Sequence, residues 1–325
     1  MKTINKEIIQ SYIMTTAKYD FSVYEKRILY RIIELTQKHL KGQKLNKGYN
    51  IEKTLFDDRL VSVPVSAFLN GEEDKNHYQV KKALKSLRNK TFEYEDDKVW
   101  KPIGIIEKPI LDKYDTVATF ELQPEVYNAI LNFSKGFRKY ELKTAMEFES
   151  TYSMRFYELF SGQKRPITYT IETLKEMFQI TGKYKKLNDF VKRVIDVAKK
   201  ELDKKAPYSF EYRYDKTGRK VTAITFLPYD IPSNKDERLE EEKLEKQVSP
   251  AWTLDKTVLY YLKEHYCFNI KEIQTHKKLL LYASEKIDLL ETLANSRRLV
   301  EGKKNPKGYL IGIIKKKVNE VSKLF

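Results

Sequence analysis

The spacing of apolar residues changes partway through residues 150–228. Up to residue 203 they recur every three or four positions, which predicts helices at 145–163, 171–179 and 188–203. Beyond residue 207 they alternate with polar residues, which predicts two strands at 208–214 and 219–227, joined by a turn at 215–218. A further short strand is expected at 167–169. The segment is therefore predicted to fold as three helices followed by a β-ribbon.

A looser version of the same order runs from about residue 21 to residue 122. Ser22 and Glu25 form a capping-box pattern at the start of a helix that continues to about residue 39. Asn76 is the expected N-cap of a second long helix at 77–89, and a brief helix is expected at 64–69. A strand is predicted at 60–65, and strands at 91–94 and 99–107 are expected to form a hairpin through a turn at 95–98, to which residues 116–122 could add a third strand. Both hairpins begin with Phe-Glu-Tyr, at 92–94 and 210–212, which suggests an internal duplication.

Helix, helix, basic helix and β-ribbon is the order of elements in a winged-helix DNA-binding domain. The sequence therefore predicts an α+β fold with tandem winged-helix domains, followed by a small all-helical C-terminal module. The expected domains are residues 1–122, residues 123–232, a charged linker at 233–249 and the helical module at 250–325. Helices of that module are predicted at 255–265, 270–284, 287–299 and 309–324.

The charge of the chain indicates an anionic partner. Its 325 residues carry a formal net charge of +16, and nucleic acid is the first candidate because phosphates form a dense line of negative charge. An acidic membrane surface is the second. No run of about 18 apolar residues is present, so a transmembrane helix is not expected. The N-terminus lacks the pattern of a signal peptide, and the single cysteine, Cys267, fits a reducing cytoplasm.

Catalytic motifs are not found. The sequence has no G-x-x-x-x-G-K-[ST] string for nucleotide phosphates. Its four histidines are not paired at metal-ligand spacing, as a DNA-nicking enzyme with a tyrosine nucleophile or a zinc site would require. The acidic pairs Asp57-Asp58 and Asp96-Asp97 fall in predicted loops. We therefore expect a protein that is not an enzyme and that carries no cofactor or metal.

The two basic helices are the best candidates for contact with DNA, because each has one apolar face and one polar face, although solvated helices share this pattern. Each basic helix is the third helix of its unit and is followed by a hairpin. This position favours contact with DNA over a merely solvated surface. Lys192 and Arg193 are the first choices in the second unit, and Gln79 and Lys82 in the first. The full set of expected DNA-binding residues is Lys185, Lys186, Asn188, Lys192, Arg193, Lys199, Lys200, Arg213, Lys216, Arg219, Lys220, Asn76, Gln79, Lys82 and Lys85.

Several strings resemble the initiator Rep proteins of theta-replicating, iteron-containing plasmids. They are Tyr152-Ser-Met-Arg-Phe-Tyr-Glu-Leu-Phe160, Ile171-Glu-Thr-Leu-Lys175, Asp189-Phe-Val-Lys-Arg-Val194, Ala198-Lys-Lys-Glu-Leu202, Arg219-Lys-Val221 and Ile224-Thr-Phe226. In the first unit, Phe21-Ser-Val-Tyr-Glu-Lys-Arg-Ile-Leu29 resembles the opening helix of that family. The likeness covers roughly residues 5–230.

The resemblance implies two winged-helix domains of common ancestry that bind double-stranded DNA at direct repeats in a plasmid origin. It also implies a monomer–dimer equilibrium, with dimers on an inverted repeat that represses the gene, and recruitment of the host initiator and helicase. Asn305-Pro-Lys-Gly-Tyr-Leu310 is similar to a motif near the ends of several plasmid and phage replication proteins. This short match leaves three roles open for the helical module: helicase recruitment, extra DNA contact and structural capping.

Three alternatives remain at this point. The first is a transcriptional repressor with the same fold and no initiator role. The second is a DNA-nicking replication enzyme. The third is an adaptor whose main task is to load a helicase through its C-terminal module.

Overall fold

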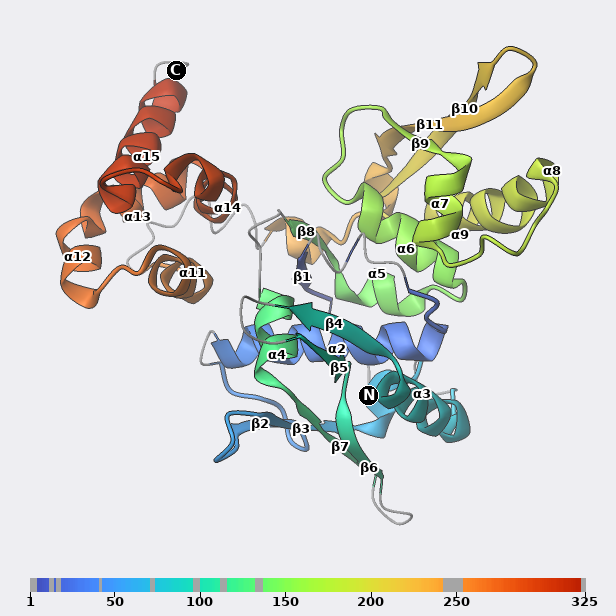
Figure 1. Ribbon diagram of the computed structural model, residues 1–325, viewed down its shortest axis with the longest axis horizontal. Coiled ribbons are helices and arrows are strands. Elements are labelled where there is room, and N and C mark those ends of the chain that lie inside the picture. Colours follow the sequence, from blue (N-terminus) through green and yellow to red (C-terminus); the bar gives the residue numbers. More distant parts are fainter. Residues whose placement is uncertain are drawn as a thin grey trace.

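The computed structural model describes residues 5–11, 15, 19–40, 43–70, 74–95, 100–111, 116–131, 137–241 and 254–322. Figure 1 shows two α+β units, in blue to teal and in green to yellow, and a helical module in orange and red. Buried apolar side chains form two cores. One extends from Ile8 to Phe226 and is shared by the two α+β units, and the other lies within the helical module.

The first unit is built on helix α2 (Val23–Leu40), most of whose residues are buried. Its capping box is present, since Ser22 N donates to Glu25 Oε2 at 2.6 Å and Glu25 N donates to Ser22 Oγ at 3.3 Å. The other elements are β2 (Asn50–Lys53), β3 (Arg59–Pro64), η1 (Val65–Phe68), α3 (His77–Asn89), β4 (Thr91–Glu95), β5 (Trp100–Gly104), β6 (Glu107–Leu111) and β7 (Val117–Leu122). Helix α3 buries Val80, Ala83, Leu84 and Leu87, the face that helical spacing predicts.

The strands of this unit pair differently from the sequence-based expectation. The strand expected at 99–107 is two strands, β5 and β6, separated at residues 105–106. Strands β4 and β5 form a hairpin by themselves, whereas β7 lies inside a four-stranded sheet of order β2-β3-β7-β6. The prediction that residues 116–122 add a third strand to the hairpin was therefore wrong. The turn expected at 95–98 lies mostly outside the described residues.

Two strands that the sequence did not reveal connect the units. Strand β1 (Glu7–Ser11) pairs antiparallel with β8 (Phe137–Glu141), in a register that joins Glu7 to Glu141. Helices α4 (Pro124–Leu131) and α5 (Leu142–Glu147) flank β8 in the sequence. The β1–β8 pair thus ties the N-terminal segment to the start of the second unit.

The second unit contains α6 (Thr151–Phe160), β9 (Ile167–Thr170), α7 (Ile171–Met177), α8 (Leu187–Phe190), the π-type turn η2 (Val191–Ile195), α9 (Asp196–Lys205), β10 (Tyr208–Thr217) and β11 (Lys220–Asp230). Its three-stranded sheet has the order β10-β11-β9. Phe156 and Phe160 of α6 pack on Phe210 and Phe226 of the sheet, with ring centroids 5.0–5.5 Å apart. These aromatic contacts join the helices to the β-ribbon.

The single helix expected at 145–163 is two helices, α5 and α6. Phe148 has an extended backbone and ends α5, and the Ser150 side chain accepts from Tyr152 N at 3.2 Å to begin α6. Phe148 is fully buried, with its ring 5.2 Å from that of Tyr157. Packing of this ring accounts for the break in a segment whose apolar spacing is otherwise helical.

A buried ion pair joins the two units where α2 meets α6. Lys26 Nζ lies 2.5 Å from Glu158 Oε1, and the two side chains are only 4% and 0% exposed. Tyr30 Oη donates to the same carboxylate at 2.7 Å, and Gln10 Nε2 donates to it at 3.0 Å. Burial lowers the pKa of Lys26, although the carboxylate of Glu158 opposes this shift. The contact between the units therefore includes a buried polar cluster beside the shared apolar core.

The C-terminal module consists of α11 (Lys256–Tyr266), α12 (Ile270–Thr275), α13 (Lys277–Lys286), α14 (Leu289–Val300) and α15 (Pro306–Ser322). The helix expected at 270–284 is thus two helices that meet at His276. Ile9 and Phe137 of the β1–β8 pair pack against the core of the module, and Lys139 Nζ lies 2.5 Å from Asp288 Oδ2. The expected linker at 233–249 begins with η3 (Pro232–Asn234) and a helical turn at 237–241, and its remainder lies outside the described residues.

Candidate nucleic-acid interface

The basic helix of the second unit is divided into a buried face and an exposed face. Residues 187–205 are helical throughout, with the wider π-type turn at Val191–Ile195 in the middle. Phe190, Val194, Ile195, Ala198 and Leu202 are fully buried. The opposite face exposes Asn188, Lys192, Arg193 and Lys200. Among the described residues neither Lys192 nor Arg193 is held in an ion pair, so both cations are free for an external anion.

Lys199 differs from its neighbours, because its side chain is tied to the rest of the unit. Its Nζ lies 2.9 Å from Asp203 Oδ2, 3.0 Å from Glu211 Oε1 and 3.2 Å from Tyr229 Oη. Burial alone would lower the pKa of Lys199, but these hydrogen bonds outweigh it and raise the pKa above its ordinary value. The residue therefore connects α9 to the base of the β-ribbon. Lys200, next to it, stays exposed.

The β-ribbon is the wing of this unit. Strands β10 and β11 pair as far as Thr217 and Lys220, so the turn is shorter than the one expected at 215–218. Gly218 has φ +62°, a conformation that glycine adopts without strain. Arg213, Lys216, Arg219 and Lys220 are exposed along the wing, and Arg213 Nε is 3.9 Å from Asp215. The exposed cations fit contact with phosphates beside a groove.

A second hydrogen bond fixes the wing to the helix. Tyr212 Oη of β10 donates to Asp196 Oδ1 of α9 at 2.7 Å. The ion pair between Lys199 and Glu211 and the contacts of Tyr229 Oη with Lys199 and Asp203 also link helix and wing through side chains. Lys185 and Lys186 are exposed on the loop before α8. In that loop Tyr184 has φ +52°, and its carbonyl accepts from Lys175 Nζ at 2.9 Å.

The first unit presents α3 in the corresponding position. Asn76 caps this helix, since its side chain accepts from Gln79 N at 3.4 Å. Lys82 and Lys85 are exposed, and Gln79 is half-buried. Other exposed side chains of α3, which are not in the predicted set, are His77, Tyr78, Lys81, Arg88 and Asn89. The amphipathic pattern of the sequence could have identified these residues, because they lie on its polar side.

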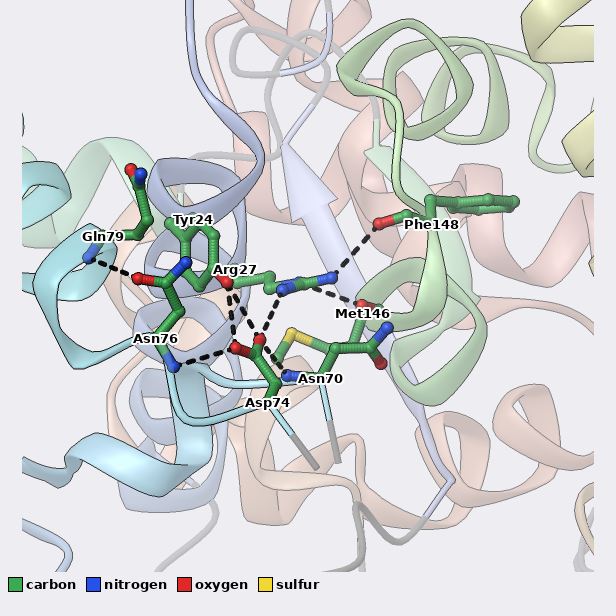
Figure 2. A network of polar contacts seen from close by, with 8 residues as sticks. All are labelled: Tyr24, Arg27, Asn70, Asp74, Asn76, Gln79, Met146 and Phe148. Atoms are coloured by element: carbon green, nitrogen blue, oxygen red, sulfur yellow. Dashed lines mark hydrogen bonds and ion pairs between the residues drawn. The ribbon is translucent and has the colours of Figure 1, made fainter. Parts of the chain in front are cut away.

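The start of α3 is held by a network around Asp74, shown in Figure 2. The carboxylate accepts from Tyr24 Oη at 3.0 Å, Asn70 N at 2.9 Å and Asn76 N at 3.1 Å. Burial alone would raise the pKa of Asp74, but these donors outweigh it and lower the pKa.

Arg27 extends this network to the second unit. Its guanidinium reaches Asp74 at 3.4 Å and donates to the carbonyls of Met146 at 3.1 Å and Phe148 at 3.4 Å (Figure 2). The position of α3 is thereby connected to the α5–α6 junction of the second unit.

The helices and strands that carry these exposed cations can be located in the fold. Figure 1 shows α3, α8 and the β10–β11 wing on the side away from the helical module. The elements that carry most of the predicted residues thus lie on one side of this view, while Lys199 and Asn76 make structural contacts within their own units. Within the described ranges, no group of three or more histidine, cysteine, aspartate or glutamate side chains is arranged to hold a metal. Nor does any helix within those ranges have the length and apolar character needed to cross a bilayer.

These observations define a class of protein, a DNA-binding protein with two winged-helix domains and a helical C-terminal region. The family model described as "Initiator Replication protein, WH1" matches residues 7–161. The model described as "Initiator Rep protein, WH2" matches residues 170–227. Together the two matches cover more than half of the chain, which belongs to the initiator Rep protein family. The predicted family and fold class are confirmed.

A solved structure agrees with this assignment at the level of the fold. It is the crystal structure of the Pi initiator protein in complex with iteron DNA, which matches with a TM-score of 0.55 and 17% sequence identity. The match covers 71% of this chain and 98% of that chain. The helical module lies beyond the residues that the two family models match.

Proposed function

We propose that this protein starts plasmid replication by binding repeated double-stranded sequences in the origin through both winged-helix units. The observation that carries the proposal is the pair of basic helices, α3 and α8–α9, exposed on the same side of a chain that both initiator domain models match. The protein acts as a binding protein and not as an enzyme. It works in the bacterial cytoplasm, where it recruits the host initiator and helicase.

Within this proposal the second unit makes the main base contacts. Lys192 and Arg193 lie at the centre of the exposed face of the basic helix and reach base edges in the major groove. Lys185, Lys186, Lys216, Arg219 and Lys220 contact phosphates around it. The first unit contributes α3 and the surface for a second copy. Monomers occupy direct repeats, and dimers occupy an inverted repeat near the gene and repress it.

Footprinting on the DNA that flanks the gene tests the proposal. Evenly spaced protected segments that share one sequence are expected, and protection should weaken steeply with salt, by about 0.9 in log K per log salt for each neutralised phosphate. A plasmid that carries this segment should replicate only when the protein is supplied. Specific binding without replication would favour a repressor. Relaxation of supercoiled origin DNA by the protein with Mg²⁺ would show a nicking enzyme and overturn the proposal.

A further inference from the structure

The last helix of the chain has a broad solvent-exposed face that the winged-helix fold does not use. Helix α15 buries Leu310, Ile311, Ile314 and Val318 in the core of the helical module. Six of its exposed residues lie along one side of the helix, and they are Gly308, Tyr309, Gly312, Lys315, Lys316 and Asn319. At 100° per residue they form one continuous surface along the helix. We call these six residues and the preceding Lys303 and Lys304 the α15 face.

The charge of this region is strongly positive. Residues 301–320 contain six lysines and two glutamates. Lys303, Lys304, Lys315 and Lys316 are exposed. The ion pair of Lys316 with Glu320 is long, at 4.0 Å, and both side chains are mostly exposed, so it does little to neutralise the lysine. The α15 face is therefore complementary to a polyanion.

An exposed aromatic ring lies among these lysines. Tyr309 is 47% exposed, and Lys303 Nζ lies over its ring at 5.1 Å from the centroid. A Cβ at Gly312 would meet nothing within 4 Å, so the helix surface near the ring is open. Lysines that follow a backbone beside an aromatic ring are the two parts of a surface that binds single-stranded nucleic acid, in which bases stack on the ring.

The start of the helix is held in a fixed geometry. Asn305 Oδ1 accepts from Gly308 N at 2.9 Å, and Asn305 O accepts from Tyr309 N at 3.0 Å. Lys307 Nζ is anchored to both carboxylate oxygens of Glu272 at 2.8 Å. The turn that carries Lys303 and Tyr309 is therefore organised before any ligand binds, which lowers the entropic cost of binding.

The location of α15 excludes a shared binding site with the basic helices. Figure 1 shows α15 on the opposite side of the molecule from α3, α8 and the wing. The α15 face is therefore separate from the elements proposed to hold the duplex. A second duplex would offer phosphates to the lysines, but its stacked bases would leave no free face for Tyr309.

We propose that the α15 face binds single-stranded DNA. This inference rests on the proposed function, because an initiator that binds an origin duplex with one side holds a melted strand with the other. Single-stranded and double-stranded DNA share the phosphodiester backbone that the lysines contact. Stacking of a base on Tyr309 gives the α15 face its preference for the single strand.

The test uses the full chain saturated with an unlabelled duplex from the footprinted region, so that the winged helices are occupied. A fluorescein-labelled oligodeoxythymidylate of about 20 nucleotides is then titrated and its anisotropy measured. Wild type should bind it, and Tyr309→Ala should weaken binding about tenfold. Lys315→Ala combined with Lys316→Ala should lower the slope of log K against log salt by about 0.7 for each lysine that contacts a phosphate.

The matched control lies in the same module. Tyr282 is 44% exposed on α13, and Lys286 Nζ lies 5.8 Å from the centroid of its ring, as Lys303 does over Tyr309. Tyr282→Ala should leave binding of the oligonucleotide unchanged. Equal loss in both tyrosine variants, or no binding by wild type, would overturn the inference. Tighter binding of a labelled duplex than of the single strand would also overturn it.

The proposed function is tested separately by the same variants. Their footprints on the repeated duplex should match wild type, and their far-ultraviolet circular dichroism melts should coincide with it. If no footprint forms with wild type, the proposed function fails. The titration of the oligonucleotide without duplex then still decides whether the α15 face binds a single strand.

Discussion

Removing the buried carboxylate between the two winged-helix units should sharply destabilise the protein. Glu158→Gln keeps the shape of the side chain but leaves the charge of Lys26 buried without its partner, with both sites less than 5% exposed. Loss of one member of a buried pair costs about 3–5 kcal/mol. Because whole domains are stable by only about 5–15 kcal/mol, the urea midpoint should fall strongly.

The double variant Lys26→Met with Glu158→Leu separates charge from packing. It removes both charges together, and the remaining loss is that of the hydrogen bonds from Tyr30 and Gln10, about 1–3 kcal/mol. The double variant should therefore be more stable than either single variant, and the double-mutant cycle gives their coupling.

Urea unfolding followed by circular dichroism measures these free energies. Lys143→Gln, which removes an exposed pair with Glu147 at 3.9 Å, is the control and should cost less than about 1 kcal/mol. If Glu158→Gln also costs less than about 1 kcal/mol, or if the double variant is no more stable than the single ones, the buried pair does not hold the units together as described.

Three further predictions concern the DNA-binding unit and the helical module. Lys192→Ala and Arg193→Ala should each weaken binding of the repeat in a mobility-shift assay by about 1–3 kcal/mol if the residue reads a base, whereas equal loss on random DNA would mark a phosphate contact. Lys199→Ala should lower the melting temperature of the protein without changing the salt slope of binding, since its charge is used by Asp203 and Glu211; a lower slope would show a phosphate contact. Burial and nearby Arg297 lower the pKa of His265 from 6.5 to about 4, so the unfolded chain takes up the proton first. The stability of the module should thus be complete above about pH 6.5 and fall as the pH approaches 4, and His265→Phe should flatten this dependence in thermal melts.

The sequence predicted the second unit better than the first, because its elements follow one another closely and each has a clear period. The sequence pattern did not predict strand pairs whose two members lie far apart in the chain. Strands β1 and β8 are short, mix charged and apolar residues, and pair across about 130 residues, as from Glu7 to Glu141. Strand β7 was assigned to the nearest hairpin because neighbours usually pair, whereas it lies between β3 and β6.

The sequence allowed the polar side of the basic helix to be predicted, but not which individual residues of that side are available to DNA. Amphipathic spacing placed Lys192, Arg193 and Lys199 on one polar side. Only the fold shows that Lys199 is paired with Glu211, which lies on the strand after the helix. Lys199 therefore does not belong with the unpaired cations of that side. The break at Phe148 has the same origin, since its ring is buried against Tyr157 and its carbonyl accepts from Arg27.

The side-chain links between α9 and the wing have a consequence for the DNA. Because Tyr212 is bonded to Asp196, and Glu211 to Lys199, helix and wing cannot open or close independently. A duplex whose groove does not already match their spacing must bend or twist to fit, and that elastic cost depends on its base steps. Flexible pyrimidine–purine steps between the contacted bases should therefore raise affinity, although no side chain touches them.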